Sequence, residues 1–401
     1  MKRIFALLAL IVLAGACKTD KLVLLQQWLQ KGSNGNIDRE AFASAPLTKE
    51  EADTAAALIC DALLGEVVKA NENAWEDLEF KTGDKVMKFA YKIFGEKPED
   101  GRSLYISLHG GGNTTAQVND QQWQNQQRLY APKEGLYFVP RAAVNDWNMW
   151  FQPHIDTLFD AVIQTAVALH DVNPDKVYVM GYSAGGDGIY RLAPRSADRW
   201  AAAAMMAGHP GDVSPLGLRN IGFTLWMGGD DAAYNRNQLA AVFAQRLDSL
   251  QQADPGGYVH DVHILPGFPH WMNRLDSVAV PWMAQFRRDP LPTKVAWHQD
   301  EMIHTSFYWL AVPDGEARKD AEVIVEREGN TFTIVKNNYK TLYIGLNDAM
   351  IDFEQPVTVK QGDQVLLEQK AERTIRDLYR SVAARKDKGL VFSSYLTIPA
   401  K

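Results

Sequence analysis

The chain has 401 residues, a formal net charge of −7, 46% hydrophobic residues and 23% charged residues. This balance is typical of globular proteins and argues against disorder, and the length exceeds one average domain and can bury a sizeable core. Because no block of lysine or arginine is present, nothing suggests a nucleic-acid partner.

The N-terminus has the pattern of an export signal. Lys2 and Arg3 precede an apolar run over residues 4–13 and a small-residue cleavage site at residues 14–16. The apolar run is too short to remain as a membrane-spanning helix. We therefore expect residues 1–16 to be a signal peptide and the protein to be exported, as a periplasmic, outer-membrane or secreted protein. Cleavage would leave Cys17 first, as in bacterial lipoproteins, so a lipid on Cys17 is the one membrane contact expected; ordinary secretion is the alternative.

Residues 17–80 are predicted to form a helical N-terminal segment. Thr48-Lys-Glu-Glu51 is a capping-box pattern, in which the threonine hydroxyl and the glutamate carboxylate satisfy backbone N–H groups at a helix start. Cys60 lies in the helix that follows. Two cysteines make no disulfide framework, so we interpret Cys60 as a small core residue.

Residues 81–289 alternate between apolar strands and amphipathic helices. The expected strands are Leu104–Leu108, Leu136–Val139, one beginning at Val177, Phe223–Met227 and His260–Leu265. Helices are expected over residues 155–170, after Ser183, over residues 239–250, and up to Phe286. Continuous apolar strands between such helices predict an α/β fold, with a mostly parallel sheet covered on both faces.

After Asp289-Pro-Leu-Pro292, hydrophobic residues recur at every second position, as they do in β-strands. Residues 293–401 are therefore predicted to form a smaller, mostly β, sandwich-like domain. Its expected strands are 323–325, 331–335, 342–346, 357–359 and 391–396, with one helix over 372–386. Trp297 and residues 307–309 alternate like core residues. We interpret this domain as a packing unit that helps to shape the cleft, with a carbohydrate-binding or partner module as the alternative.

The stretch VYVMGYSAGGD, residues 177–187, takes a strand directly into a helix through Gly-Tyr-Ser-Ala-Gly. This is the nucleophile-elbow pattern, which would expose the Ser183 hydroxyl at the carboxyl end of the sheet. Gly181 and Gly185 are needed because the flanking backbone must approach closely, without a β-carbon. By itself, G-x-S-x-G is a weak signal; its position between a strand and a helix strengthens it.

A second glycine-rich turn, His109-Gly-Gly-Gly-Asn113, follows the strand that ends at Leu108. The backbone N–H of Gly111, together with that of Ala184, would hold the oxyanion of a tetrahedral intermediate. The alternative is a phosphate-binding loop. No Gly-Lys-Ser/Thr motif accompanies it, which argues against a nucleotide.

Gly181-Tyr-Ser-Ala-Gly185 and His109-Gly-Gly-Gly112 together resemble the α/β-hydrolase superfamily over residues 84–288. More narrowly, they are similar to secreted carboxylesterases of the feruloyl and acetylxylan esterase, polyhydroxybutyrate depolymerase and phospholipase/carboxylesterase-like groups. The resemblance implies a triad in the order serine, acid, histidine, without a cofactor. It selects Ser183, Asp231 with Asp230 as the fallback, and His270 in the loop after the last strand.

The remaining histidines give no metal pattern. His260 and His263 lie in one strand, where a spacing of three places side chains on opposite faces. No Cys/His/Asp cluster has metal-ligand spacing, so no metal is expected.

Three tryptophans are candidate substrate contacts. Trp147 and Trp150 follow a strand's carboxyl end and Trp271 follows His270, so the three can form an aromatic wall for an aryl or sugar group. The alternative is that they are core or rim residues. Tyr234 and Arg236, just after the acid, are expected to support its loop.

The sequence therefore predicts a secreted serine hydrolase that cleaves carboxylic esters, with esters on extracellular polysaccharide as the expected substrates. A serine peptidase similar to prolyl oligopeptidase is one alternative, although the chain lacks room for that family's propeller. A non-catalytic binding protein on the same fold is the other.

Overall fold

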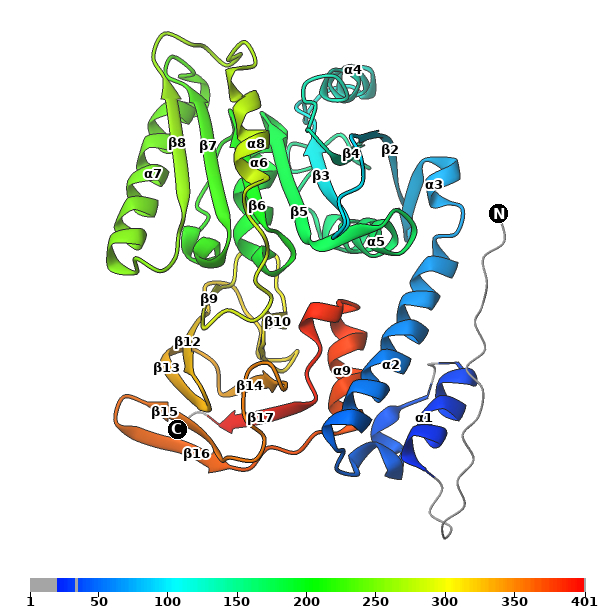
Figure 1. Ribbon diagram of the computed structural model, residues 1–401. Helices are drawn as coiled ribbons and strands as arrows, with labels where there is room; N and C mark the ends of the chain where they lie inside the picture. The colour runs from blue at the N-terminus through cyan, green and yellow to red at the C-terminus, as the bar shows by residue number, and fades with distance from the viewer. Residues whose placement is uncertain (1–19, 33–34, 400–401) are drawn as a thin grey trace.

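The computed structural model describes residues 20–32 and 35–399 (Figure 1). The expected signal peptide, residues 1–16, and Cys17 lie outside the described residues. Within the described part of the chain, no helix is both long and apolar enough to cross a membrane.

The N-terminal segment is helical, as predicted. It contains α1 (Lys21–Gln30), the short 3₁₀ turns η1 (Ile37–Arg39) and η2 (Ala41–Ser44), α2 (Lys49–Ala70) and α3 (Ala74–Asp77). The capping box is present: the Thr48 N–H donates to Glu51 Oε2 at 2.8 Å, and the Glu51 N–H donates to Thr48 Oγ1 at 3.2 Å. Cys60 is buried in the core between α2 and α9 (Ile375–Arg385), and burial raises the pKa of its thiol to about 11. Both observations agree with its interpretation as a core residue.

The central sheet has eight strands in the order β1-β2-β4-β3-β5-β6-β7-β8. Their bounds are β1 Glu79–Thr82, β2 Lys85–Phe94, β3 Arg102–Leu108, β4 Gly135–Pro140, β5 Val172–Tyr182, β6 Ala202–Met206, β7 Gly222–Gly228 and β8 His260–Leu265. β1 and β2 pair in the antiparallel sense, and β2 is antiparallel to β4. All pairs from β4 to β8 are parallel.

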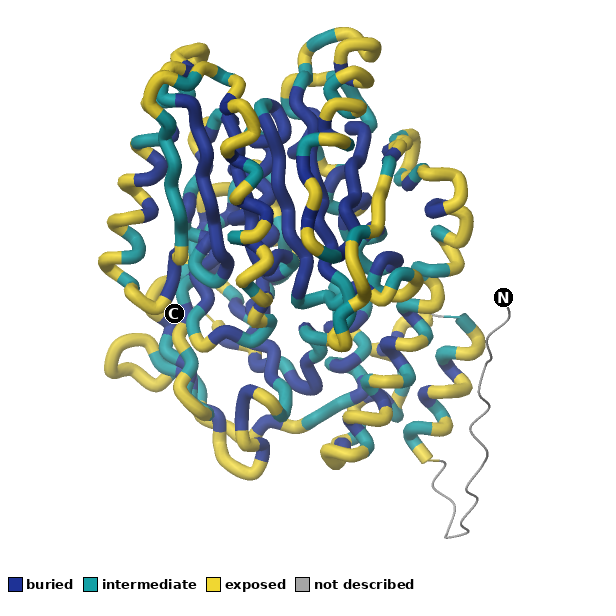
Figure 2. Tube along the Cα trace, turned by 45° about the horizontal axis from the view of Figure 1, so that its top comes forward, coloured by how far each residue is buried: buried dark blue, intermediate teal, exposed yellow. Residues whose placement is uncertain are grey.

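Helices cover both faces of this sheet. They are α4 (Ala116–Gln126), α5 (Pro153–Leu169), α6 (Ala184–Arg195), α7 (Arg236–Ala253) and α8 (Ala279–Met283). Along β3, Leu104 and Ile106 join a core with α5, α6 and α7, whereas Tyr105 joins a second core with α8. This alternation buries the strands on both faces, and Figure 2 shows them as the most continuously buried part of the chain. The fold is the α/β-hydrolase fold that the sequence predicts.

The helix expected up to Phe286 is shorter than predicted. Asn273 and Arg274 have φ of 51° and 65°, which is left-handed backbone and cannot continue a helix. A 3₁₀ turn, η6 (Leu275–Val278), follows, and α8 spans only Ala279–Met283. Pro281 lies in the first turn of α8, where its missing N–H costs no helical hydrogen bond.

The C-terminal part contains two sheets, ordered β10-β11-β14-β17 and β16-β15-β13-β12-β9. Their strands are β9 Lys294–His298, β10 Ser306–Phe307, β11 Leu310–Ala311, β12 Glu322–Glu328, β13 Thr331–Asn337, β14 Thr341–Leu346, β15 Val357–Gln361, β16 Gln364–Gln369 and β17 Ser394–Pro399. Trp297, Phe307 and Trp309 are buried, as predicted, in a core that is continuous with one face of the central sheet. The last strand begins later than expected, at Ser394, because the 3₁₀ turn η7 (Lys388–Leu390) precedes it.

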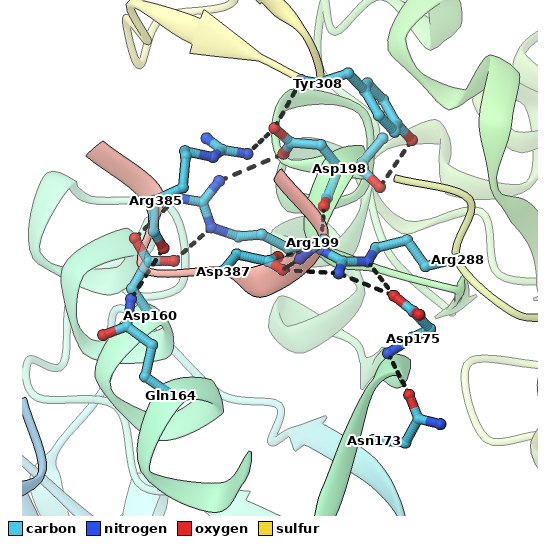
Figure 3. Close-up of polar contacts among 12 residues, drawn as sticks. Asp160, Gln164, Asn173, Asp175, Asp198, Arg199, Arg288, Tyr308, Arg385 and Asp387 are labelled. Atoms are coloured by element: carbon cyan, nitrogen blue, oxygen red, sulfur yellow. Dashed lines mark hydrogen bonds and ion pairs between the residues drawn. The ribbon is translucent and has the colours of Figure 1, made fainter. Parts of the chain in front are cut away.

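Ion pairs join α9 and the residues after it to the amino-terminal edge of the central sheet, and a hydrogen bond from Tyr308 joins the β10–β11 turn to the same cluster (Figure 3). Arg288 Nε lies 2.9 Å from Asp175 Oδ1, and the same guanidinium pairs with Asp387, which follows α9. Asp198 accepts the Tyr308 N–H at 3.0 Å and pairs with Arg385. We call Asp175, Asp198, Arg288, Arg385 and Asp387 the interface ion cluster. Its members come from distant parts of the sequence, so it forms only when the whole chain folds.

Candidate active site

Ser183 lies in the tight turn between β5 and α6 that the sequence predicts. Its backbone has φ 57° and ψ −120°, a conformation that a residue with a β-carbon adopts only under strain. A β-carbon on Gly181 would lie 2.5 Å from the backbone of Gly185, and one on Gly185 would lie 2.3 Å from the Leu108 carbonyl oxygen. The two glycines therefore allow the close approach that holds the serine in this turn.

The structure brings Ser183, His270 and Asp231 into one hydrogen-bonded chain. Ser183 Oγ lies 2.9 Å from His270 Nε2, and His270 Nδ1 lies 2.6 Å from Asp231 Oδ2. Asp231 is 3% exposed, whereas the His270 side chain is 41% exposed. The carboxylate is thus shielded behind the imidazole, and the imidazole can reach both the serine and a bound molecule.

The loop after β7 distinguishes the two candidate acids. Asp230 is exposed, and its N–H donates to the Phe268 carbonyl at 2.9 Å, which ties this loop to the histidine loop. Asp231 is the carboxylate that bonds His270. Arg236 Nη1 lies 3.6 Å from the second oxygen of Asp231, and Tyr234 packs on the Arg236 guanidinium with its ring centroid 4.9 Å away. Both residues lie against the acid loop, as expected.

Tyr182 holds the histidine loop at two points. Its hydroxyl donates to the His270 carbonyl at 2.6 Å and accepts the Met272 N–H at 3.2 Å. Its ring lies edge-on to the His270 ring, with centroids 5.9 Å apart. Because Tyr182 immediately precedes Ser183, one residue couples the position of the histidine backbone to that of the serine. The sequence analysis did not find this role, since it depends on a loop 88 residues away.

The glycine-rich turn after β3 lies beside the serine. Gly111 has φ 107°, and a β-carbon there would lie 2.2 Å from Asn119 Oδ1, so only glycine fits. Asn119 Oδ1 accepts the Gly112 N–H at 2.8 Å. The Gly111 N–H and the first N–H of α6, on Ala184, have no hydrogen-bond partner among the described residues. These two N–H groups can therefore donate to a bound oxygen.

His109 supports this turn from within the core. It is fully buried, its Nδ1 donates to the Gly110 carbonyl at 2.6 Å, and its Nε2 accepts the Ala142 N–H at 3.1 Å. Burial lowers the pKa of its imidazole to about 3, so the ring stays neutral and can keep both bonds. His109 is thus a structural residue of the turn.

A cavity of about 660 Å³ opens over Ser183 and His270. Trp271 lines it and is 44% exposed. Trp147 is 59% exposed and packs on Phe151 near Gly112, outside the set of residues that line the cavity.

The prediction that Trp150 contacts substrate is wrong. Trp150 is fully buried, and its Nε1 donates to the His109 carbonyl at 2.8 Å. Its β-carbon packs so closely under α6 that a β-carbon on Gly188 would lie 2.5 Å from it. The Trp150 side chain therefore supports the glycine-rich turn from within the core.

The opposite wall of the cavity comes from α4 and the residues after it, which the sequence analysis did not identify. Gln122, Asn125 and Arg128 line it at helical spacing, with Leu129 beside them. The signal available in the sequence was the run of amide side chains over residues 117–127, in a helix with few apolar residues. No residue of the N-terminal helices lines this cavity.

The two histidines of β8 have carboxylate partners. His260 and His263 contact Asp248 and Asp261, at 3.0 and 2.8 Å. Over residues 20–32 and 35–399, no group of three or more His, Cys, Asp or Glu side chains is arranged to hold a metal ion.

No family model matches this chain, and no curated protein matches it. Solved structures with a similar fold include esterases and serine hydrolases. A thermostable esterase matches with a TM-score of 0.41 and 18% identity, over 52% of this chain and 62% of the esterase. A candidate dipeptidyl aminopeptidase IV from Bacteroides ovatus matches with a TM-score of 0.39 and 13% identity, over 52% of this chain and 35% of that protein. The fluorophosphonate-binding serine hydrolase F of Staphylococcus aureus matches with a TM-score of 0.36 and 12% identity, over 52% of this chain and 96% of that protein. This chain spans less than two thirds of the length of the first two of these proteins.

Proposed function

We propose that this protein is an exported serine hydrolase that cleaves carboxylic esters through an acyl-enzyme intermediate. The observation that carries the proposal is the hydrogen-bonded chain from Ser183 through His270 to the shielded Asp231. A strained serine at the carboxyl edge of the sheet, with two free N–H groups beside it, supports the same conclusion.

The reaction follows from the positions of these groups. Ser183 Oγ attacks the ester carbonyl while His270 Nε2 takes its proton, and Asp231 holds the imidazole and stabilises its cation. The Gly111 and Ala184 N–H groups donate to the oxyanion, and each such donor contributes about 3–4 kcal/mol to transition-state stabilisation. His270 then gives the proton to the leaving alcohol. Water, activated by His270, releases the acid from Ser183.

Esters on extracellular polysaccharide are the proposed substrates. The export signal in the sequence would place the enzyme outside the cytoplasm, held there by a lipid if Cys17 is acylated. The cavity supports a polymer-linked substrate because it is open and lined by amide side chains, which bond hydroxyl groups, beside the exposed ring of Trp271.

Three measurements on residues 17–401 test the proposal. A fluorophosphonate is expected to label Ser183, as located by peptide mass spectrometry, and the label is expected to be absent from Ser183→Ala. Mass spectrometry of acids released from acetylated, feruloylated arabinoxylan tests the substrate, and a matched ester and amide pair tests the bond. Absence of labelling would reject a serine hydrolase. Labelling with faster amide than ester cleavage would identify a peptidase instead.

A further inference from the structure

The cavity over Ser183 has one free positive charge. Among the side chains that line it, Arg128 and His270 are the two that carry a basic group. His270 is held by Asp231 and Ser183. Arg128 is exposed, and within the described chain no carboxylate pairs with its guanidinium.

The acidic side chains near Arg128 have other partners. Arg274, from the histidine loop, donates to the Leu129 carbonyl at 2.8 Å and so holds the segment next to Arg128. Arg274 is not among the residues that line the cavity. The acids of this region are already engaged: Asp276 is buried against the Tyr130 hydroxyl and burial raises its pKa, while Asp120 pairs with Arg141. One unpaired guanidinium, that of Arg128, therefore lines the cavity over the nucleophile of a chain whose net charge is −7.

The neighbouring side chains indicate the rest of the ligand. Gln122 and Asn125 of α4 offer amide donors and acceptors in the same cavity as Arg128, which follows the end of the helix, and Trp271 offers an exposed ring. Amides and an aromatic ring suit the hydroxyl groups and the apolar face of a sugar, and a guanidinium fork suits a carboxylate. We propose that Arg128 is a specificity residue that selects esters carried on acidic sugars, in which a uronate carboxylate lies beside the ester.

This inference rests on the proposed function, and its test separates the two. Hydrolysis rates would be measured with p-nitrophenyl acetate, with an acetylated oligogalacturonide, and with the same oligosaccharide after its carboxylates are converted to primary amides. The proteins would be wild type, Arg128→Gln and Arg39→Gln. Arg39 is an exposed arginine in η1 without an ion pair among the described residues, so its variant matches the change in net charge at a distance from the cavity.

Arg128→Gln is expected to lower kcat/KM about tenfold on the acidic oligosaccharide, mainly through KM, because one charge-assisted contact is lost. On the amidated oligosaccharide and on p-nitrophenyl acetate it is expected to equal wild type, and Arg39→Gln is expected to equal wild type on all three. The wild-type preference for the acidic form should shrink as salt screens the contact.

Two results would overturn the role of Arg128 and leave the proposed esterase activity standing. One is that Arg128→Gln lowers kcat/KM equally on the acidic and the amidated oligosaccharide. The other is that the wild-type protein shows no preference for the acidic form. No hydrolysis of p-nitrophenyl acetate and no fluorophosphonate labelling would reject the proposed function, and the role of Arg128 with it.

Discussion

The two edges of the central sheet use charged and polar groups in opposite ways. At the amino-terminal edge, the charges of the interface ion cluster are paired with one another: Arg288 is shared between Asp175 and Asp387, and its side chain is 2% exposed. At the carboxyl-terminal edge, Ser183 is strained, the Gly111 and Ala184 N–H groups have no partner among the described residues, and Arg128 faces the cavity. One edge satisfies its polar groups within the chain, and the other leaves them for a ligand.

This difference teaches where stability and function reside. Polar groups that are paired on folding have nothing left to offer a substrate, and removing one partner of a buried pair destabilises the fold. Groups held unpaired, or in a strained backbone, cost stability and are found where a ligand supplies the missing partner. Substitutions at the two edges should therefore separate stability from activity.

The largest effect is expected at the nucleophile. Ser183→Ala and Ser183→Gly should each lower kcat by about 10⁴-fold or more, because no serine hydroxyl is then left for His270 to activate. Ser183→Gly should also be more stable than Ser183→Ala by about 1 kcal/mol, since glycine tolerates φ 57°. Ester hydrolysis and urea unfolding of both variants measure this. Equal stability would show that this turn stores no strain.

At the opposite edge, Arg288→Met should lower the free energy of unfolding by about 3–5 kcal/mol, because it leaves the largely buried Asp387 and the partly exposed Asp175 without their cation. Activity measured well below the melting temperature should stay unchanged. The adjacent Arg287 pairs with Asp100 at an exposed site, with the two side chains 58% and 42% exposed, so Arg287→Gln should change stability by less than about 1 kcal/mol. Similar losses in both variants would contradict the assignment of stability to the buried cluster.

Asp254, at the amino-terminal edge, makes the free energy of unfolding depend on pH. Hydrogen bonds from Arg219, at 2.8 and 3.0 Å, lower its pKa from 3.8 to about 2, and Lys294 of β9 adds a third contact at 2.9 Å. A depressed carboxyl pKa stabilises the fold above the unfolded value of 3.8, and this stability is lost as the pH falls through about 2.

Asp254→Asn should therefore cost about 1–2 kcal/mol at pH 7, and the difference from wild type should disappear toward pH 2. Urea unfolding as a function of pH measures this difference. Asp212→Asn is the control, because Asp212 is 73% exposed and its nearest cation lies 3.7 Å away. A cost that does not change with pH would mean that packing, not charge, accounts for the effect.

The smallest effect on activity is expected at Tyr182, which holds the histidine loop. Tyr182→Phe removes both hydrogen bonds to the histidine loop, and kcat should fall about tenfold with KM unchanged, because one such bond contributes about 1 kcal/mol. Tyr178→Phe is its matched control: the Tyr178 hydroxyl, on the same strand, donates to the Phe286 carbonyl at 2.9 Å, away from His270. A similar fall in kcat for both variants would show that Tyr182 acts only through stability.

The sequence by itself determined the α/β fold, the strand-to-helix turn at Ser183, and the glycine-rich turn after β3. These features depend on local rules: hydrophobic period sets strands and helices, and glycines mark where backbone must pass close to backbone. The capping box at Thr48 and the buried Trp297 follow for the same reason. The choice of Asp231 and His270 rested on a resemblance, and the structure places His270 against Ser183 and Asp231 against His270.

Only the tertiary structure decided which side chains surround that serine. Trp150 and Trp271 look alike in sequence, yet one is fully buried under α6 and the other lines the cavity. The contacts of Tyr182 with His270, of Arg128 with the cavity, and of Arg288 with Asp387 each join positions far apart in the chain. Hydrophobic period cannot specify such pairs, because they depend on how packed elements bring distant loops together, and that is settled only when the whole core forms.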